Sequence, residues 1–244
     1  GPRTRIERVG ITPSGDGAED PRVAALIERF PLKSGDPLLH SRYEQGKTQL
    51  SAALFGWGYI DARYTRTQLR VNPETARADI VLDIETGQRF RFGEITIEQD
   101  ELNDELLRRY LPISPGDEFS PRALLDTQFK LGDLGYFSRV DIEPQRDQAD
   151  GDLVPIIIRT EYLNSQRYSA GLGYGTDTGA RLSLSTEFRR INRRGHWVNT
   201  DFRLSEIKNS VGANYNIPLG YIPGERLTFS TTYQDEEFED GDSS

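Results

Sequence analysis

The sequence predicts two α+β modules followed by an antiparallel, all-β segment. Three observations indicate this fold class. A β-α-α-β-β string of elements occurs twice, the residues from Tyr168 onward alternate between apolar and polar positions, and no stretch is apolar for long enough to form a membrane-spanning helix. The hydrophobic fraction of 35% and the charged fraction of 28% are ordinary for a chain that buries a core.

The repeat is clearest in two stretches with a common skeleton. They read "LKSGDPLLHSRYEQGKTQLSAALFGWGYI" at Leu32–Ile60 and "ISPGDEFSPRALLDTQFKLGDLGYFSRV" at Ile113–Val140. Each contains a Gly-Asp turn before a helical segment and a Gly-Tyr pair after it. Either pair alone is common turn punctuation. Together, in the same order and within the same string of elements, they indicate one structural unit used twice.

The first module is expected to begin with a strand over Arg5–Ile11. A helix follows, with Asp20 as N-cap, Pro21 at its first position and an apolar stripe at helical spacing, made of Val23, Leu26, Ile27 and Phe30. After the Gly-Asp turn we expect a second helix capped by Ser41, with Glu44 three residues on. Two strands, Tyr59–Val71 and Ala76–Glu85, complete the unit.

The second module repeats this order. Its strand is expected over Phe90–Glu98, and its first apolar stripe is made of Leu102, Leu106, Leu107 and Tyr110. Ser120 with Pro121 predicts the start of the second helix, and Phe137–Glu143 with Leu153–Thr160 predict the final strand pair. Glycines at 56, 58, 132 and 135 are expected to end the second helices.

The element order and the two motifs resemble POTRA domains, the periplasmic modules of outer-membrane insertases and secretion porins. The resemblance covers Arg3–Glu161, as one domain over residues 3–86 and another over residues 88–161. The junction Thr86-Gly87-Gln88 is only a few residues long, which argues for two domains held in a set relation instead of on a flexible linker.

The remaining chain, residues 167–244, keeps one apolar and one polar face over five predicted strands. Such alternation fits a soluble sandwich or a membrane barrel. Strands of eight to eleven residues, with Arg, Glu, Asp and Asn on the polar face, favour the barrel. A five-strand piece cannot close a barrel, and there is no methionine even at position 1, so we expect an internal piece of a longer protein.

The stretch "RYSAGLGYGTDTGARLSLSTEFRRINRRGH" at Arg167–His196, directly after a second POTRA-like module, resembles the barrel entry of TamA-like assembly factors of the BamA superfamily. The family has three POTRA domains and a sixteen-strand barrel, and by order the two modules match its second and third POTRA domains. The resemblance implies an outer-membrane protein with periplasmic POTRA domains. It further implies β-barrel and autotransporter clients, outer-membrane lipid and an inner-membrane-anchored TamB-like partner. The alternative is a two-partner secretion porin, which passes an unfolded substrate through its lumen.

Two strands are candidate sites of strand pairing. The first barrel strand meets the last one in the family, and here it offers Tyr168, Ala170, Gly171, Leu172, Gly173, Tyr174 and Gly175 as a seam that a client strand could enter. Its glycines contribute no cross-strand side-chain pairs, although they could equally serve only barrel curvature. The family leaves one POTRA strand at the sheet margin, which corresponds to Tyr64, Arg66, Thr67, Leu69 and Arg70.

Other chemistry is not indicated. The chain has no cysteine and two distant histidines, His40 and His196, so neither a metal nor a cofactor site is expected, and no constellation of titrating groups suggests an enzyme. The net charge of −9 argues against nucleic-acid binding. "GLGYG" at Gly171–Gly175 lies in a strand pattern, not before a helix. The arginines at 189, 190, 193 and 194 fit either lipid phosphates or a solvated turn, and the acidic stretch 235–244 fits a solvated outer loop.

Overall fold

In the computed structural model, which describes residues 4–175 and 179–236, strands dominate and four α-helices lie in the first two thirds of the chain. The elements are β1 (Arg5–Ser14), η1 (Asp16–Ala18), α1 (Pro21–Glu28), α2 (His40–Gly56), β2 (Arg63–Asn72), β3 (Arg77–Glu85), β4 (Arg91–Glu98), α3 (Asp104–Arg108), α4 (Pro121–Gly132), β5 (Phe137–Pro144), η2 (Arg146–Gln148), β6 (Leu153–Tyr162), β7 (Gln166–Gly175), β8 (Gly179–Phe188), β9 (Trp197–Ser205), β10 (Lys208–Pro218) and β11 (Arg226–Glu236). Arg3 and the acidic residues 237–244 lie outside the described residues.

The chain divides into two compact units. The first contains Gly1–Thr96, Ile113–Leu125 and Pro144–Ile156, and the second contains Ile97–Pro112, Asp126–Glu143 and Ile157–Ser244. The first unit therefore holds the first repeat with three stretches of the second. The second unit holds the rest of the second repeat with the last five strands.

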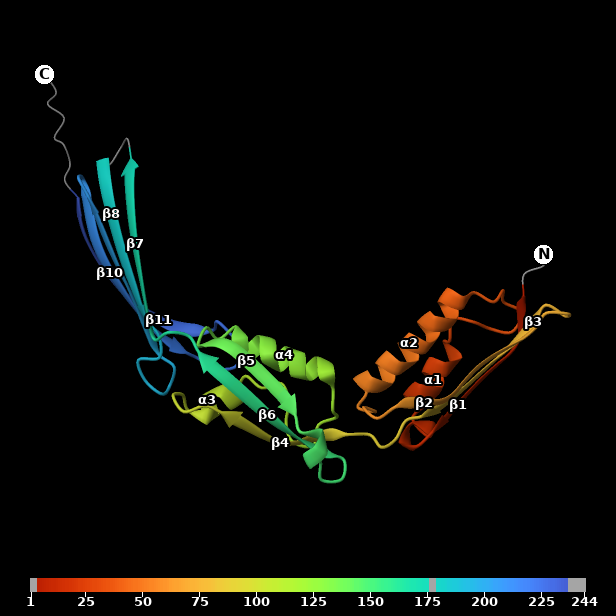
Figure 1. Cartoon of the computed structure of the whole chain (residues 1–244). Helices are drawn as coiled ribbons and strands as arrows, with labels where there is room; N and C mark the ends of the chain where they lie inside the picture. Colours follow the sequence, from red (N-terminus) through yellow and green to blue (C-terminus); the bar gives the residue numbers. More distant parts are fainter. Residues whose placement is uncertain (1–3, 176–178, 237–244) are drawn as a thin grey trace, which may run out of the picture. The chain divides into compact units, whose positions relative to one another are not determined.

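The first repeat is a three-stranded sheet with helices on one face. The strand order is β1-β3-β2, with β1 parallel and β2 antiparallel to the central β3 (Figure 1). Every second residue of β3 is buried, namely Ala78, Ile80, Leu82 and Ile84. Ile80, Leu82 and Ile84 share a core with residues of both helices, which is why both helices cover the same face. These residues are Val23 of α1, Phe30 just after it, and Leu50 and Leu54 of α2.

Two helix starts follow different rules. Asp20 caps α1 as predicted, since its carboxylate accepts the Arg22 N–H at 2.8 Å. The predicted cap of α2 by Ser41 is wrong, because α2 begins at His40 and its N-cap, Leu39, makes no side-chain hydrogen bond. The preceding Leu38 packs against the core and donates its N–H to the Thr4 carbonyl at 2.9 Å. Tertiary packing, not a hydroxyl cap, sets this start.

The first Gly-Tyr pair ends α2 and does not begin a strand. Gly58 has φ +92°, and the Tyr59 N–H donates back to the Leu54 carbonyl at 3.0 Å, which is the Schellman arrangement at a helix C-terminus. The prediction of a strand from Tyr59 is wrong by four residues, since β2 begins at Arg63. Tyr59 is instead buried, with 2% of its surface exposed.

The second repeat has a sheet of order β4-β6-β5, so its element string matches the first. Its first helix, α3, has only five residues, and the predicted stripe extends beyond it at both ends. All four stripe residues, Leu102, Leu106, Leu107 and Tyr110, are nevertheless buried. The periodicity thus identified the core-facing residues correctly and overestimated the length of the helix.

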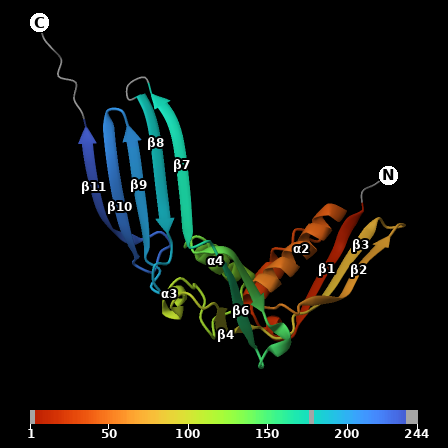
Figure 2. The same ribbon diagram turned by 60° about the vertical axis from the view of Figure 1, so that its left-hand side comes forward.

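The last five strands form one antiparallel sheet of order β11-β10-β9-β8-β7 (Figure 2). Large apolar side chains on it are exposed, including Leu172 at 87% and Tyr174 at 81%. A sandwich would bury this face, so an open piece of a barrel sheet is the better description of the two that the alternation allowed. None of the helices in the described ranges is both long and apolar enough to cross a membrane.

Candidate functional site

The predicted POTRA edge residues all lie on β2, which pairs only with β3 within the described part of the chain. Leu69 and Tyr64 pack against the core, and the Tyr64 hydroxyl donates to the Lys47 carbonyl of α2 at 2.9 Å. Arg66, Thr67 and Arg70 are exposed. The pairing register shifts between Tyr64 and Arg66, which marks a bulge at one end of the strand. Among the residues that the structure describes, the outer side of β2 therefore has no strand paired with it.

A groove lies between α2 and the start of this edge strand. It has a volume of about 540 Å³, and it is lined by Glu44, Lys47, Thr48, Ser51, Ala52, Phe55, Ala62 and Tyr64. The Phe55 side chain is 49% exposed there. An exposed phenylalanine beside an unpaired strand edge offers an apolar contact to the side chains of an added strand, while the edge offers backbone hydrogen bonds.

The second repeat has an equivalent groove, between α4 and β5, which is the edge strand of its sheet. Its volume is about 460 Å³, and Phe129, which lines it, is 67% exposed. Sequence reasoning chose only the edge of the first repeat. The repeat itself was the signal for the second groove, because a matching element string places a matching edge next to a matching helix.

The predicted seam residues lie on β7, at one edge of the five-stranded sheet. In the described residues β7 pairs with β8 along its length, and no strand pairs with its other side. Gly171 lies opposite Ser183, whose hydroxyl donates to the Gly171 carbonyl at 3.3 Å, and a Cβ at Gly171 would come within 2.7 Å of that hydroxyl. A Cβ at Gly173 would meet no atom within 4 Å. Packing against β8 therefore favours glycine at 171 and does not require it at 173.

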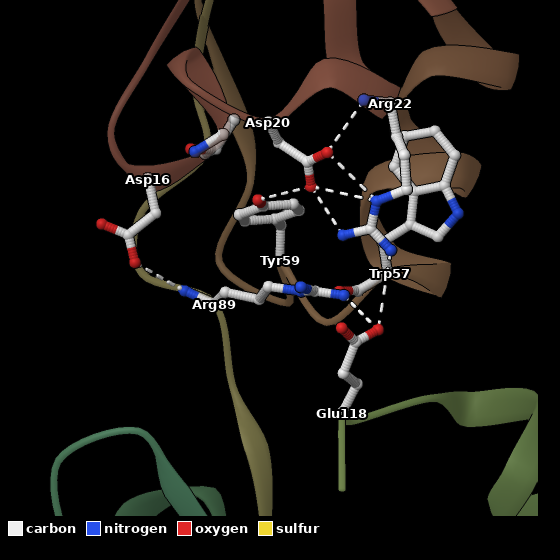
Figure 3. Close-up of polar contacts among 9 residues, drawn as sticks. Asp16, Asp20, Arg22, Trp57, Tyr59, Arg89 and Glu118 are labelled. Carbon is white, nitrogen blue, oxygen red and sulfur yellow. Dashed lines mark hydrogen bonds and ion pairs between the residues drawn. The ribbon is translucent and has the colours of Figure 1, made fainter.

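A polar cluster joins the first repeat to the start of the second. Figure 3 shows its center, the Asp20 carboxylate, which accepts hydrogen bonds from the Arg22 guanidinium at 2.6 Å and the Tyr59 hydroxyl at 3.0 Å. The hydrogen bond from Arg22 is the main cause that lowers the pKa of Asp20, so this carboxyl is charged at neutral pH. Arg22 also lies over the Trp57 ring at 5.2 Å and approaches Glu118 at 3.5 Å.

Arg89 makes the other half of the cluster. Its main-chain N–H donates to the Asp16 carboxylate at 3.0 Å, its Nε donates to the Trp57 carbonyl at 2.9 Å, and its guanidinium pairs with Glu118 (Figure 3). The Phe90 N–H donates to the Gly58 carbonyl at 2.9 Å. Positive and negative groups thus alternate through the junction. Each is already engaged by protein groups, so the cluster connects the repeats and offers no open coordination site.

The two histidines stand apart. His40 begins α2, with its ring 6.1 Å from that of Tyr43. His196 precedes β9, and its Nδ1 lies 2.7 Å from the Tyr215 hydroxyl. Burial is the main cause that lowers the pKa of His196, so the ring is neutral at neutral pH. The described residues contain no group of three or more His, Asp or Glu side chains placed to hold a metal ion.

Comparisons with known proteins concern the second repeat and the fold of the chain. Residues 90–161 match the POTRA family, described as "Surface antigen variable number repeat". The outer membrane protein assembly factor BamA of Nitratidesulfovibrio vulgaris is 23% identical over 224 residues, which cover 89% of this chain and 27% of that protein. The chain therefore spans about a quarter of the length of that relative.

Two solved structures share the fold. The structure of BamA from Haemophilus ducreyi lacking POTRA domains 1–3 matches with a TM-score of 0.74 and 20% identity, over 95% of this chain and 43% of that one. CdiB from Acinetobacter baumannii matches with a TM-score of 0.51 and 16% identity, over 96% of this chain and 45% of that one. Both likenesses cover nearly the whole of this chain, so they support the fold class predicted from the repeat and the alternation.

Proposed function

We propose that this chain is part of a TamA-like assembly factor for β-barrel and autotransporter proteins. It belongs to the BamA superfamily and lies in the bacterial outer membrane, with its POTRA repeats in the periplasm. The work of such a factor is strand exchange, and no covalent bond is made or broken. Residues 3–86 and 88–161 act as the second and third POTRA domains, and residues 167–244 supply the first strands of the barrel.

One observation carries the proposal: β7 is a sheet edge whose glycines leave its pairing mainly to the backbone. Cross-strand side-chain pairs each contribute roughly 0.2–1 kcal/mol, and glycines at 171, 173 and 175 forgo them. A strand held by backbone groups alone can exchange partners of any sequence. Tyr168, Leu172 and Tyr174 are largely exposed, which suits contact with lipid on the outer face.

The POTRA grooves supply an earlier step. An extended client segment would add to β2 with its main chain and place an apolar side chain against Phe55. The α4 and β5 groove offers the same chemistry through Phe129. A TamB-like protein anchored in the inner membrane is the proposed periplasmic partner, and it would deliver clients to these edges.

The test locks the seam in the full-length protein. Cysteines replace Ala170 and the facing residue of the last barrel strand, and client assembly is measured with the pair oxidised and reduced. We expect assembly to stop on oxidation and to return on reduction. The matched control pairs cysteines at Ala170 and Leu184, which face each other on β7 and β8, and this lock leaves the seam free.

Unimpaired assembly with the seam locked would refute the proposal that client strands enter at the seam. The same experiment separates the alternative, a two-partner secretion porin, because a substrate that passes through the lumen does not need β7 to part from its neighbour. Export that continues with the seam oxidised would favour that alternative.

A further inference from the structure

The second Gly-Tyr pair does more than end a helix. Tyr136 follows α4 and is the counterpart of Tyr59. Only 4% of its surface is exposed. Its hydroxyl donates to the Gly195 carbonyl at 2.7 Å, and its own carbonyl accepts the Leu163 N–H at 2.9 Å and the Arg190 guanidinium at 3.2 Å. One buried residue thus makes one contact with the chain before β7 and two with the turn after β8.

These contacts lie at the start of β7, the end of β8 and the start of β9, which are called the near ends of these strands. Leu163 lies three residues before β7 begins, and Arg190 and Gly195 lie in the turn that joins β8 to β9. The same region is closed by the Arg189 N–H, which donates to the Ser165 carbonyl at 2.7 Å. The starts of β7 and β9 and the end of β8 are therefore fastened together on the second repeat, at Tyr136.

Arg190 is held in its turn by several side-chain contacts. It is not a glycine, yet its φ is +53°, a left-handed conformation that is costly for ordinary residues. Its side chain is only 4% exposed, pairs with Glu101 at 2.7 Å and lies over the Tyr162 ring at 4.5 Å. For this arginine both interpretations, lipid phosphates and a solvated turn, are wrong, because its guanidinium is turned into the protein. Such a strained backbone persists only where surrounding contacts determine it.

The fit at Gly195 is equally close. Gly195 has φ +74°, and a Cβ there would lie 2.5 Å from the Tyr136 hydroxyl oxygen. The turn can therefore approach Tyr136 only with glycine at this position. A second link, from the Asn103 N–H to the Arg193 carbonyl at 2.8 Å, holds the same turn to the loop before α3.

We propose that Tyr136 and Arg190 are positioning residues for strand exchange. They hold the near end of β7 in register with β8 while the glycine-containing part of β7 separates from the closing strand of the barrel. This inference rests on the proposed function of the seam. If the near end were free, an incoming strand could displace β7 from β8 as easily as enter beside it. With the near end of β7 fixed to β8, only the other edge of β7 can separate from its partner. This separation begins in the residues after the near end.

The test uses Tyr136→Phe in the full-length protein in lipid bilayers, because this change removes one hydroxyl and keeps the ring. The control is Tyr110→Phe, a tyrosine of the same repeat that is 3% exposed and has no hydroxyl hydrogen bond in the described residues. Amide hydrogen exchange of residues 163–169 is measured beside the rate of client assembly. Losing one buried hydrogen bond predicts a roughly two- to tenfold rise in exchange for Tyr136→Phe. Assembly should slow by a similar factor, and Tyr110→Phe should change neither.

Arg190→Lys is the second variant, since it keeps the charge opposite Glu101 and loses the guanidinium fork. It should raise exchange over the same residues even if Tyr136→Phe failed to reach the membrane. Exchange that stays at the wild-type rate in both variants would overturn the inference. Faster exchange with unchanged assembly would also overturn the inference, because the contacts would then stabilise the fold without affecting strand exchange. The exchange measurement does not depend on the seam, so failure of the proposed function in the locking experiment remains distinguishable.

Discussion

Gly58 offers a sharp test of the junction between the repeats. Its φ of +92° is unfavourable for any residue with a side chain, and a Cβ there would lie 3.0 Å from the Phe90 carbonyl oxygen and 3.1 Å from that of Phe119. Both oxygens belong to the backbone of the second repeat. Gly58→Ala therefore introduces backbone strain and also pushes against atoms that cannot move without opening the junction.

The magnitude follows from a matched control. Gly35 has φ +90°, almost the same conformation, and a Cβ there would meet nothing within 4 Å. Gly35→Ala should cost only the conformational term, about 1–2 kcal/mol. Gly58→Ala should cost about 1–3 kcal/mol more, the usual range for overpacking a fitted site. The free energy of unfolding from chemical denaturation of residues 3–161 measures both.

The expected result is that Gly58→Ala is the more destabilising change, and that X-ray scattering of the folded variant shows a wider range of separations between the repeats than Gly35→Ala does. Equal losses of stability with identical scattering profiles would mean that the close approach at Gly58 does not hold the repeats together. The reasoning from the Phe90 and Phe119 carbonyls would then be wrong.

Two further predictions concern the groove and the polar cluster. Phe55→Ser should weaken binding of an extended client peptide several-fold at unchanged thermal stability, because the ring is 49% exposed. Leu39→Ser, at a 38% exposed position outside the groove, should leave peptide binding unchanged. Peptide titration followed by fluorescence anisotropy measures both. The pKa of Asp20 is lowered in the folded state, so the contribution of its charge to stability is fully present above the ordinary carboxyl pKa near 3.8 and is lost as the pH falls below that value. The stability difference between wild type and Asp20→Asn should therefore shrink in that acidic range and stay constant above it. Denaturation at a series of pH values measures this difference.

Periodicity and motif order were sufficient to predict the repeats and the five final strands, because these depend on which residues face a core or a membrane. The Asp20 cap was also predictable, since a carboxylate before Pro21 needs only local contacts. Ser41 misled because the start of α2 is set by Leu38 in the core, which no local rule reports. The short α3 illustrates the same point, as buried apolar residues need not continue a helix.

The site was less predictable from the sequence than the fold. Residues on β2 and β7 could be placed at edges by resemblance, whereas the grooves beside Phe55 and Phe129 depend on the distance between a helix and a strand. Arg190 could not have been identified as buried, because an arginine in a basic turn is ordinarily solvated and its partner Glu101 is remote in sequence. Long-range ion pairs of this kind carry no periodic signal.

The two strand edges differ in a way that bears on their roles. An exposed edge in water invites pairing with another copy of the same chain, and β2 limits this with exposed arginines at 63, 66 and 70 and with the bulge beside Tyr64. The seam segment Tyr168–Gly175 carries no charge at all. Under the proposed function, the charged β2 edge would capture a client briefly and reversibly, because each added strand must tolerate the arginines. An uncharged edge in a membrane cannot stay unpaired, since no water satisfies its backbone groups. Under the proposed function, the β7 edge would therefore always hold a partner, either the closing strand of its own barrel or the strand of a client. Exchange between the two would cost little, because both pair through the same backbone groups.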